Sequence, residues 1–311
     1  QKWNNCGPAN LSMALSYWDW PGTQLDTAAV LKPNPRDKNV MPYEMASFVE
    51  EHTGLQAIVR LAGDLELLKA LIGAGFPVVI EKGFEGANFD GWMGHYEVVS
   101  GYDDARERFT VQDSYIMANL PVPYAEMEAA WRAFNYLYIV VYPAEREGEV
   151  QAILGPQWDE TANYQTAAER ASVEIFNSSG RDLYFAWFNR GTSLVRLQDY
   201  AGAASAYDKS IELYNALEPE QRPFRMLWYQ TGPYFAYYYT GRYQDVVDMV
   251  DILILRRVDK PYLEESWYWR AKAKVALGDL EGAIEDYRTA LKYHPGFLPA
   301  LQDLETLGVS P

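Results

Sequence analysis

Residues 1–10 read QKWNNCGPAN, and this stretch contains Cys6, the single cysteine of the 311-residue chain. A lone cysteine forms no internal disulfide and no multi-cysteine metal site, so Cys6 is either an inert buried thiol or a nucleophile. Pro8 suits the first turn of a helix, and residues 10–18 place apolar side chains at helical spacing. Cys6 is therefore expected at a helix N-terminus, where the helix dipole lowers a thiol pKa, and this context favours the nucleophile.

A cysteine nucleophile needs a base, and the chain offers three histidines. His52 and His294 stand at the expected ends of helices, where a cation is favourable without any catalytic role. His95 differs, because it opens the stretch GHYEVVSGYDD at 94–104, which alternates like a strand and ends in a turn. A second strand ending in Asp113 follows after a short connection, so a hairpin is expected to bring these two residues together. A carboxylate there can orient the imidazole and stabilise its cation.

An acyl-transfer site also needs donors for the oxyanion that forms on the attacked carbonyl. Gln1 precedes Cys6 closely and is expected to offer its side-chain amide, with the Cys6 backbone N–H as a second donor. A solvated chain end is the alternative interpretation of Gln1.

The chain carries these candidate residues in the order Gln1, Cys6, His95 and Asp113. Together with the glycines that flank the thiol and the imidazole, this order resembles the papain-like cysteine peptidases of family 39 over residues 1–143. The resemblance implies an α+β papain-like fold with Cys6 as the nucleophile and His95 as the base. It also implies Asp113 as the residue that orients the imidazole and Gln1 as an oxyanion donor.

The same resemblance indicates Trp92, Gly94 and Asn5 as candidates for the substrate cleft. Its best-known members cut double-glycine leaders from bacteriocins while fused to transporters, but no transporter follows here. No apolar run of membrane-spanning length is present either, so the leader substrate does not transfer. The start of the sequence at Gln1 leads us to expect an exported or envelope-associated bacterial protein, with a cytoplasmic one as the alternative.

The composition changes after residue 143, and residues 144–160 are expected to form a linker. Residues 161–311 then follow helical spacing almost throughout, with one unit at 264–297 that has the tetratricopeptide pattern. Its characteristic small and aromatic positions are Trp267, Ala271, Ala283, Tyr287, Ala290 and Pro295. The C-terminal part is therefore predicted to be an all-α tetratricopeptide-repeat solenoid.

Two earlier repeats are predicted at 184–217 and 227–260, the second of them divergent. Residues 161–178 are expected to add a leading helix, and residues 297–307 a final cap of the kind that solenoids need for solubility. Such arrays bind peptides or protein partners, while a spacer or dimerisation module is the alternative.

The net charge of −16 argues against nucleic acid as a partner, because binding phosphates requires clustered Lys and Arg. No metal-ligand spacing is present in the sequence, and thiol catalysis needs no cofactor, so neither is expected. Three functions stay open: a thiol hydrolase, most simply a cysteine peptidase acting on a peptide or protein; an acyltransferase on the same scaffold; and a non-catalytic adaptor that binds peptides.

Overall fold

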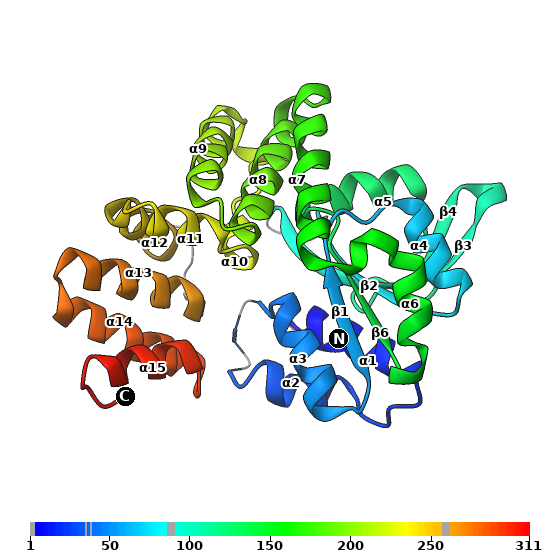
Figure 1. Cartoon of the computed structure of the whole chain (residues 1–311), viewed down its shortest axis with the longest axis horizontal. Helices are drawn as coiled ribbons and strands as arrows, with labels where there is room; N and C mark the ends of the chain where they lie inside the picture. Colours follow the sequence, from blue (N-terminus) through cyan, green and yellow to red (C-terminus); the bar gives the residue numbers. More distant parts are fainter. Residues whose placement is uncertain (1–3, 35, 38, 86–90, 257–261) are drawn as a thin grey trace.

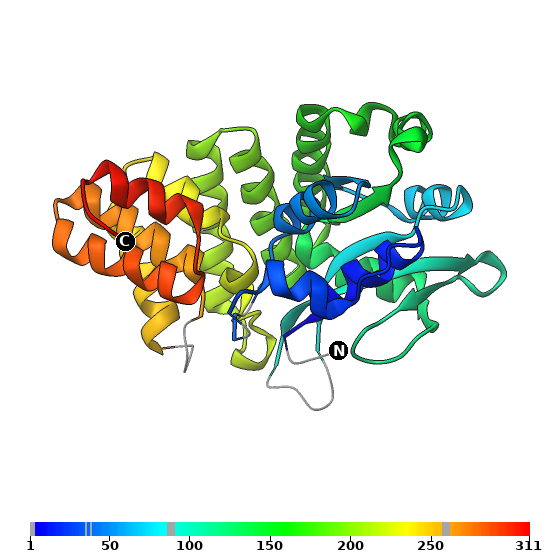
Figure 2. The same cartoon turned by 90° about the horizontal axis from the view of Figure 1, so that it is seen from below.

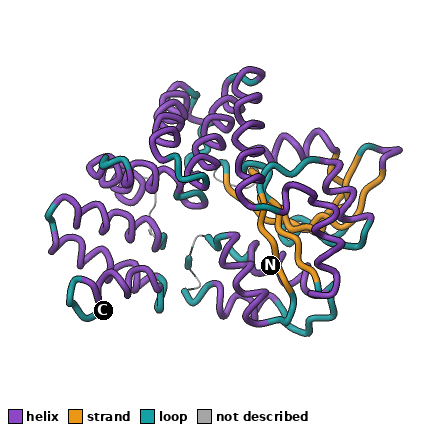
Figure 3. Tube along the Cα trace, in the orientation of Figure 1, coloured by secondary structure: helices purple, strands orange, loops and turns teal. Residues whose placement is uncertain are grey.

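The computed structural model describes residues 4–34, 36–37, 39–85, 91–256 and 262–311. A domain built on a β-sheet and an array of helices lie side by side, and strands occur only in the first of them (Figures 1 and 3). The sheet has six strands in the order β1-β6-β2-β3-β4-β5, and every neighbouring pair is antiparallel. Its strands are β1 (Gln56–Arg60), β2 (Val78–Phe84), β3 (Met93–Asp103), β4 (Arg108–Gln112), β5 (Leu120–Pro123) and β6 (Tyr138–Tyr142).

Helices cover both faces of this sheet (Figure 2). One face carries α1 (Cys6–Ser16), α2 (Gln24–Leu31) and α3 (Pro42–His52), and the other carries α4 (Leu65–Gly73), α5 (Tyr124–Trp131) and α6 (Glu147–Leu154). Alternating side chains of each central strand enter the two separate cores, as the two-residue period of a strand requires. The predicted α+β fold is confirmed.

Local sequence signals set several of these boundaries. Helix α4 begins after Asp64, whose carboxylate accepts a hydrogen bond from the Leu67 N–H at 2.8 Å, as an N-cap residue does. Helix α3 begins with Pro42, and Glu44 accepts the Met41 N–H at 2.7 Å.

The structure differs from the expected linker at 144–160. This segment forms α6, whose Val150 and Leu154 are buried in the core beside the sheet. Two buried apolar residues on one face of a short helix give little periodic signal. The polar residues around them therefore led us to expect a linker in place of α6.

The remaining helices form the repeat array. They are α7 (Glu160–Asn177), α8 (Gly180–Arg196), α9 (Tyr200–Ala216), α10 (Met226–Tyr229), α11 (Gly232–Tyr239), α12 (Tyr243–Arg256), α13 (Glu264–Leu277), α14 (Leu280–Tyr293) and α15 (Leu298–Thr306). Close packing within a repeat needs small residues: a side chain at Gly191 would place its Cβ 2.7 Å from the ring of Tyr207. In the middle repeat the first helix is divided into α10 and α11, and Pro233 stands in the first turn of α11, where its missing N–H is tolerated.

One hydrophobic core joins the sheet domain to the array. It combines Trp92 and Phe134 of the sheet domain with Phe185 of α8 and aromatic residues of later helices. Polar contacts add to it, because Asn163 of α7 exchanges hydrogen bonds of 2.9 and 2.8 Å with the backbone of Leu61. Among the described residues, no helix combines the length and apolar composition needed to cross a membrane.

Candidate active site

Cys6 is the first residue of α1, directly after the N-cap residue Asn5, and its side chain is partly exposed. The His95 ring and the backbone N–H groups of Tyr96 and Gly7 lie near the sulfur and act to lower the pKa of the thiol. Helix α1 thus delivers the thiol to β3, and the donors around the sulfur are those that stabilise a thiolate.

His95 lies on β3 with 4% of its surface exposed, and its Nε2 is 3.0 Å from Oδ1 of Asp113. Because Nε2 faces the carboxylate, Nδ1 is the nitrogen left for the thiol. Asp113 follows β4 and also accepts the N–H groups of Tyr115 at 2.7 Å and Ile116 at 2.9 Å, which fixes its carboxylate. The predicted hairpin of β3 and β4 is the element that brings the two residues together.

The electrostatics favour a charged pair. Burial opposes ionisation of Cys6, but the hydrogen bond and the charge of His95 outweigh it, and the pKa of the thiol is lowered. Burial likewise opposes the imidazolium, yet its interactions with the Asp113 carboxylate and with Cys6 raise the pKa of His95 to about 9. Both shifts favour the thiolate–imidazolium pair over the neutral pair.

Asn10 is a part of the site that sequence reasoning missed. It is fully buried, and its Nδ2 lies 2.9 Å from the Cys6 carbonyl oxygen, 2.6 Å from that of Tyr96 and 2.9 Å from Oγ of Ser114. This one amide connects α1, β3 and the loop after Asp113. Asn10 lies one helical turn after Cys6, and this spacing was the feature of the sequence that could have indicated its place in the site.

The predicted cleft residues have different surroundings. Asn5 is buried beside the thiol at the start of α1. Trp92 stacks on Phe134 with ring centroids 5.8 Å apart and belongs to the core shared with the repeats. Gly94 packs so tightly that an added Cβ would lie 2.7 Å from Phe134. Gln1 lies outside the described residues.

The repeat array contributes directly to the surroundings of the thiol through Tyr229 of α10. Its ring packs against Gly94, and burial together with the nearby Cys6 raises the pKa of this phenol. Arg225 anchors the same segment by donating to the Trp92 carbonyl oxygen at 3.0 Å. Nothing in the sequence of this divergent repeat indicated the contact.

A cavity of about 520 Å³ lies between the sheet domain and the inner side of the array. Glu81 lines it on the sheet, Tyr229 lines it on α10, and Arg196, Glu265 and Lys272 line it on other helices of the array. Burial and the nearby Cys6 raise the pKa of Glu81 well above its usual range.

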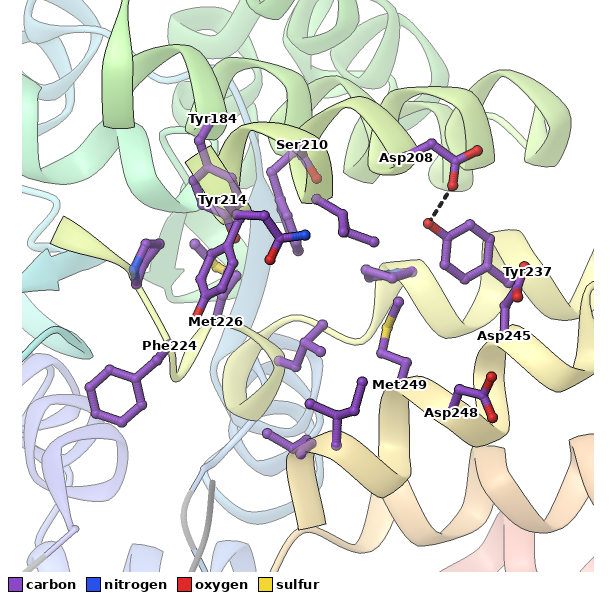
Figure 4. A pocket seen from close by; sticks show the side chains of 18 of the residues that line it. Tyr184, Asp208, Ser210, Tyr214, Phe224, Met226, Tyr237, Asp245, Asp248 and Met249 are labelled. Carbon is purple, nitrogen blue, oxygen red and sulfur yellow. Dashed lines mark hydrogen bonds between the residues drawn. The ribbon is translucent and has the colours of Figure 1, made fainter. Parts of the chain in front are cut away.

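A second hollow lies within the array. A groove of about 560 Å³ runs between α9, α11 and α12 and is lined mainly by apolar side chains. Figure 4 shows Phe224 on one side of this groove, and Asp245 and Asp248 on the other. Tyr237 donates a hydrogen bond of 2.8 Å to Asp208 across it.

The sheet domain has a cysteine-peptidase-type fold and is joined to a helical repeat array. Comparison with protein families agrees: residues 1–139 match the Peptidase C39 like family, and residues 186–216 and 264–297 match the tetratricopeptide repeat. The expected resemblance to C39-like peptidases, followed by tetratricopeptide repeats, is thus confirmed.

A solved structure described as a C39-like peptidase from Bacillus anthracis is 19% identical to this chain. The match covers 44% of this chain and 88% of that one, with a TM-score of 0.36. No curated protein matches the sequence.

Proposed function

We propose that this protein is a cysteine peptidase in which Cys6 is the nucleophile, His95 the proton carrier and Asp113 the residue that orients it. One observation carries the proposal: Nε2 of His95 lies 3.0 Å from Asp113 Oδ1, and the same imidazole is close enough to Cys6 to lower the pKa of the thiol. This is the arrangement that thiol-based acyl transfer requires.

The reaction follows from these positions. The Cys6 thiolate attacks the carbonyl carbon of a peptide bond, and the oxyanion that forms accepts the Cys6 backbone N–H at the start of α1. The C–N bond breaks as His95 gives its proton to the leaving amine, which leaves a thioester on Cys6. Water then gives a proton to His95 and its hydroxide to the acyl carbon, and the C–S bond breaks to release the acid. Gln1 stays the predicted second oxyanion donor.

The test is acyl-enzyme formation. Wild-type protein mixed with an activated peptide ester is expected to gain the mass of one acyl group, measured on the intact chain. Cys6→Ala should gain none, while His52→Ala, which changes a histidine at the exposed end of α3, should behave like the wild type. An adduct that persists in Cys6→Ala would refute the proposal, and the adaptor function would then take its place.

We propose further that the groove of the array binds the substrate or a partner protein as an extended peptide. Its wall is mainly apolar. Among the described lining residues the charged ones are Asp208, Asp245, Asp248 and the single cation Arg242, so the groove has a formal net charge of −2. This chemistry fits a peptide with an apolar side chain next to Lys or Arg.

Fluorescence anisotropy with two labelled peptides tests this preference, one with Lys and one with Glu beside a central Phe. The Lys peptide should bind more tightly, and Asp248→Lys should reverse the order. Glu285→Lys, an equal charge change at an exposed position on α14, serves as the control. Equal binding of both peptides would contradict the proposed role.

A further inference from the structure

Three side chains with metal-binding atoms meet where the sheet domain touches the last repeat. Asp37 comes from the connection between α2 and α3, Glu264 is the first residue of α13, and His294 follows α14. One donor atom from each lies within 4.8 Å of those of the other two. Asp37 and Glu264 are only 3% and 2% exposed.

The contacts of Glu264 leave one of its oxygens unsatisfied. Oε1 lies 2.8 Å from Nδ1 of His294, but Oε2 is buried and has no hydrogen-bond partner among the residues that the structure describes. A buried carboxylate oxygen without a partner is costly, because it has lost its water without gaining a donor. Its position within the cluster indicates a missing positive ligand.

Two further carboxyl groups face this cluster, and one cation, Lys32, acts against them. Glu44 on α3 and Glu265 on α13 are partly buried and act on the same group of carboxylates. Burial raises the pKa of Glu44 to about 7, and burial together with the nearby Asp37 raises the pKa of Glu264 well above its usual range. Lys32 opposes them, although its ammonium already donates to the Asn4 carbonyl oxygen at 2.7 Å.

We infer that Asp37, Glu264 and His294 bind a divalent transition-metal ion. One imidazole nitrogen and two carboxylate groups form a donor set that suits Zn²⁺ or Mn²⁺, with water completing the coordination. The ion would supply the positive charge that the buried carboxylates need, and it would give Glu264 Oε2 a partner.

Such an ion joins two parts of the chain that are distant in sequence. The connection between α2 and α3 points toward α13 and α15 (Figure 1), and Arg36 beside the cluster donates to the Tyr262 hydroxyl at 3.0 Å. The metal would hold the last repeat against the sheet domain, at the border of the cavity that lies between the sheet domain and the array. Its role is therefore structural and lies apart from Cys6.

Isothermal titration calorimetry of the full-length chain with Zn²⁺ or Mn²⁺ alone tests the inference. The Cys6→Ser variant is the starting protein, because the thiol and His95 are themselves potential zinc ligands. One equivalent of at least one of the two metals should bind. Asp37→Asn, Glu264→Gln and His294→Ala should each weaken binding by about tenfold or more, whereas His52→Ala should leave it unchanged.

Thermal unfolding provides a second readout that separates a lost ligand from a damaged fold. The metal should raise the Tm of Cys6→Ser, as any ligand of the folded state does. In EDTA, the Cys6→Ser protein that also carries Glu264→Gln should have a Tm equal to or above that of Cys6→Ser alone, since the change removes a buried acidic group. In metal-containing buffer without EDTA, the Tm of this double variant should no longer rise. Absence of binding by Cys6→Ser, or equal binding by all three ligand variants, would overturn the inference.

Discussion

At the scale of single residues, the candidate site depends on one imidazole that lies between two acidic partners. His95 is almost fully buried, so only the combined effect of Cys6 and Asp113 keeps its pKa at about 9. This arrangement makes His95 a proton donor at neutral pH and favours the thiolate form of Cys6.

Asp113→Asn should therefore lower the pKa of His95 from about 9, because the amide removes the charge that stabilises the imidazolium. The amide oxygen can still accept the N–H groups of Tyr115 and Ile116, so the loop should be preserved. An NMR titration of His95 measures the change, with Asp103→Asn in an exposed turn as the control. Unchanged titration of His95 in Asp113→Asn would contradict the assigned role.

The raised pKa of His95 also makes the free energy of unfolding depend on pH. A group whose pKa is raised on folding stabilises the protein fully below its unfolded value of 6.5, and this contribution is lost as the pH rises through about 9. The stability advantage of the wild type over Asp113→Asn should accordingly shrink across that interval.

Asn10→Ala should destabilise the protein by about 1–3 kcal/mol, because two buried carbonyl oxygens and the Ser114 hydroxyl lose a common donor. It should also slow alkylation of Cys6, since α1 is no longer fixed to β3. Urea unfolding measures the first effect. Asn215→Ala, at an exposed position on α9, should change stability by less than about 0.5 kcal/mol, and equal losses in both variants would count against the role of Asn10.

At the scale of secondary-structure elements, α10 is the unexpected part of the site. It is only four residues long, yet it places Tyr229 against Gly94 and close to Cys6. The repeat array is thus part of the wall around the thiol.

Tyr229→Ala should admit larger reagents to Cys6 while leaving the acidity of the thiol nearly unchanged. We expect the alkylation rate with a bulky maleimide to rise relative to iodoacetamide. Tyr229→Phe keeps the ring and loses only the hydroxyl, so its ratio of rates should stay at the wild-type value. A ratio that is the same in all three proteins would show that α10 does not restrict access.

The elements that the sequence predicted well are those with strong local signals. Helix α1 was indicated by the apolar spacing after Pro8, and the β3–β4 hairpin by strand alternation on both sides of a short turn. The position of α10 had no such signal, since Arg225 contacts Trp92 across 133 residues of sequence. Only tertiary packing sets contacts of that range.

At the scale of the whole molecule, the sheet domain and the array share one core. Trp92 lies at its centre, with its ring 5.8 Å from Phe134 and 6.0 Å from Phe185. The sequence predicted both domains but not this junction, and it likewise gave no indication that Asp37 meets Glu264 and His294. Both depend on how the array curves back toward the sheet.

Trp92→Ala should lower the free energy of unfolding by about 3–5 kcal/mol, the usual effect of removing a large buried aromatic side chain. Because its ring touches both domains, both should unfold together at a lower denaturant concentration. Phe176→Ala, with 88% of the side chain exposed, is the matched control. Two separate transitions, of which only one shifts, would contradict a shared core.

The central claim is that Cys6 is a thiolate paired with His95, and the pH dependence of its alkylation by iodoacetamide tests this most directly. The wild type and His52→Ala should react well below the usual pKa of a thiol, whereas His95→Ala should react only as the pH approaches that range. If Cys6 is unreactive, or titrates like an ordinary thiol with and without His95, the claim is wrong.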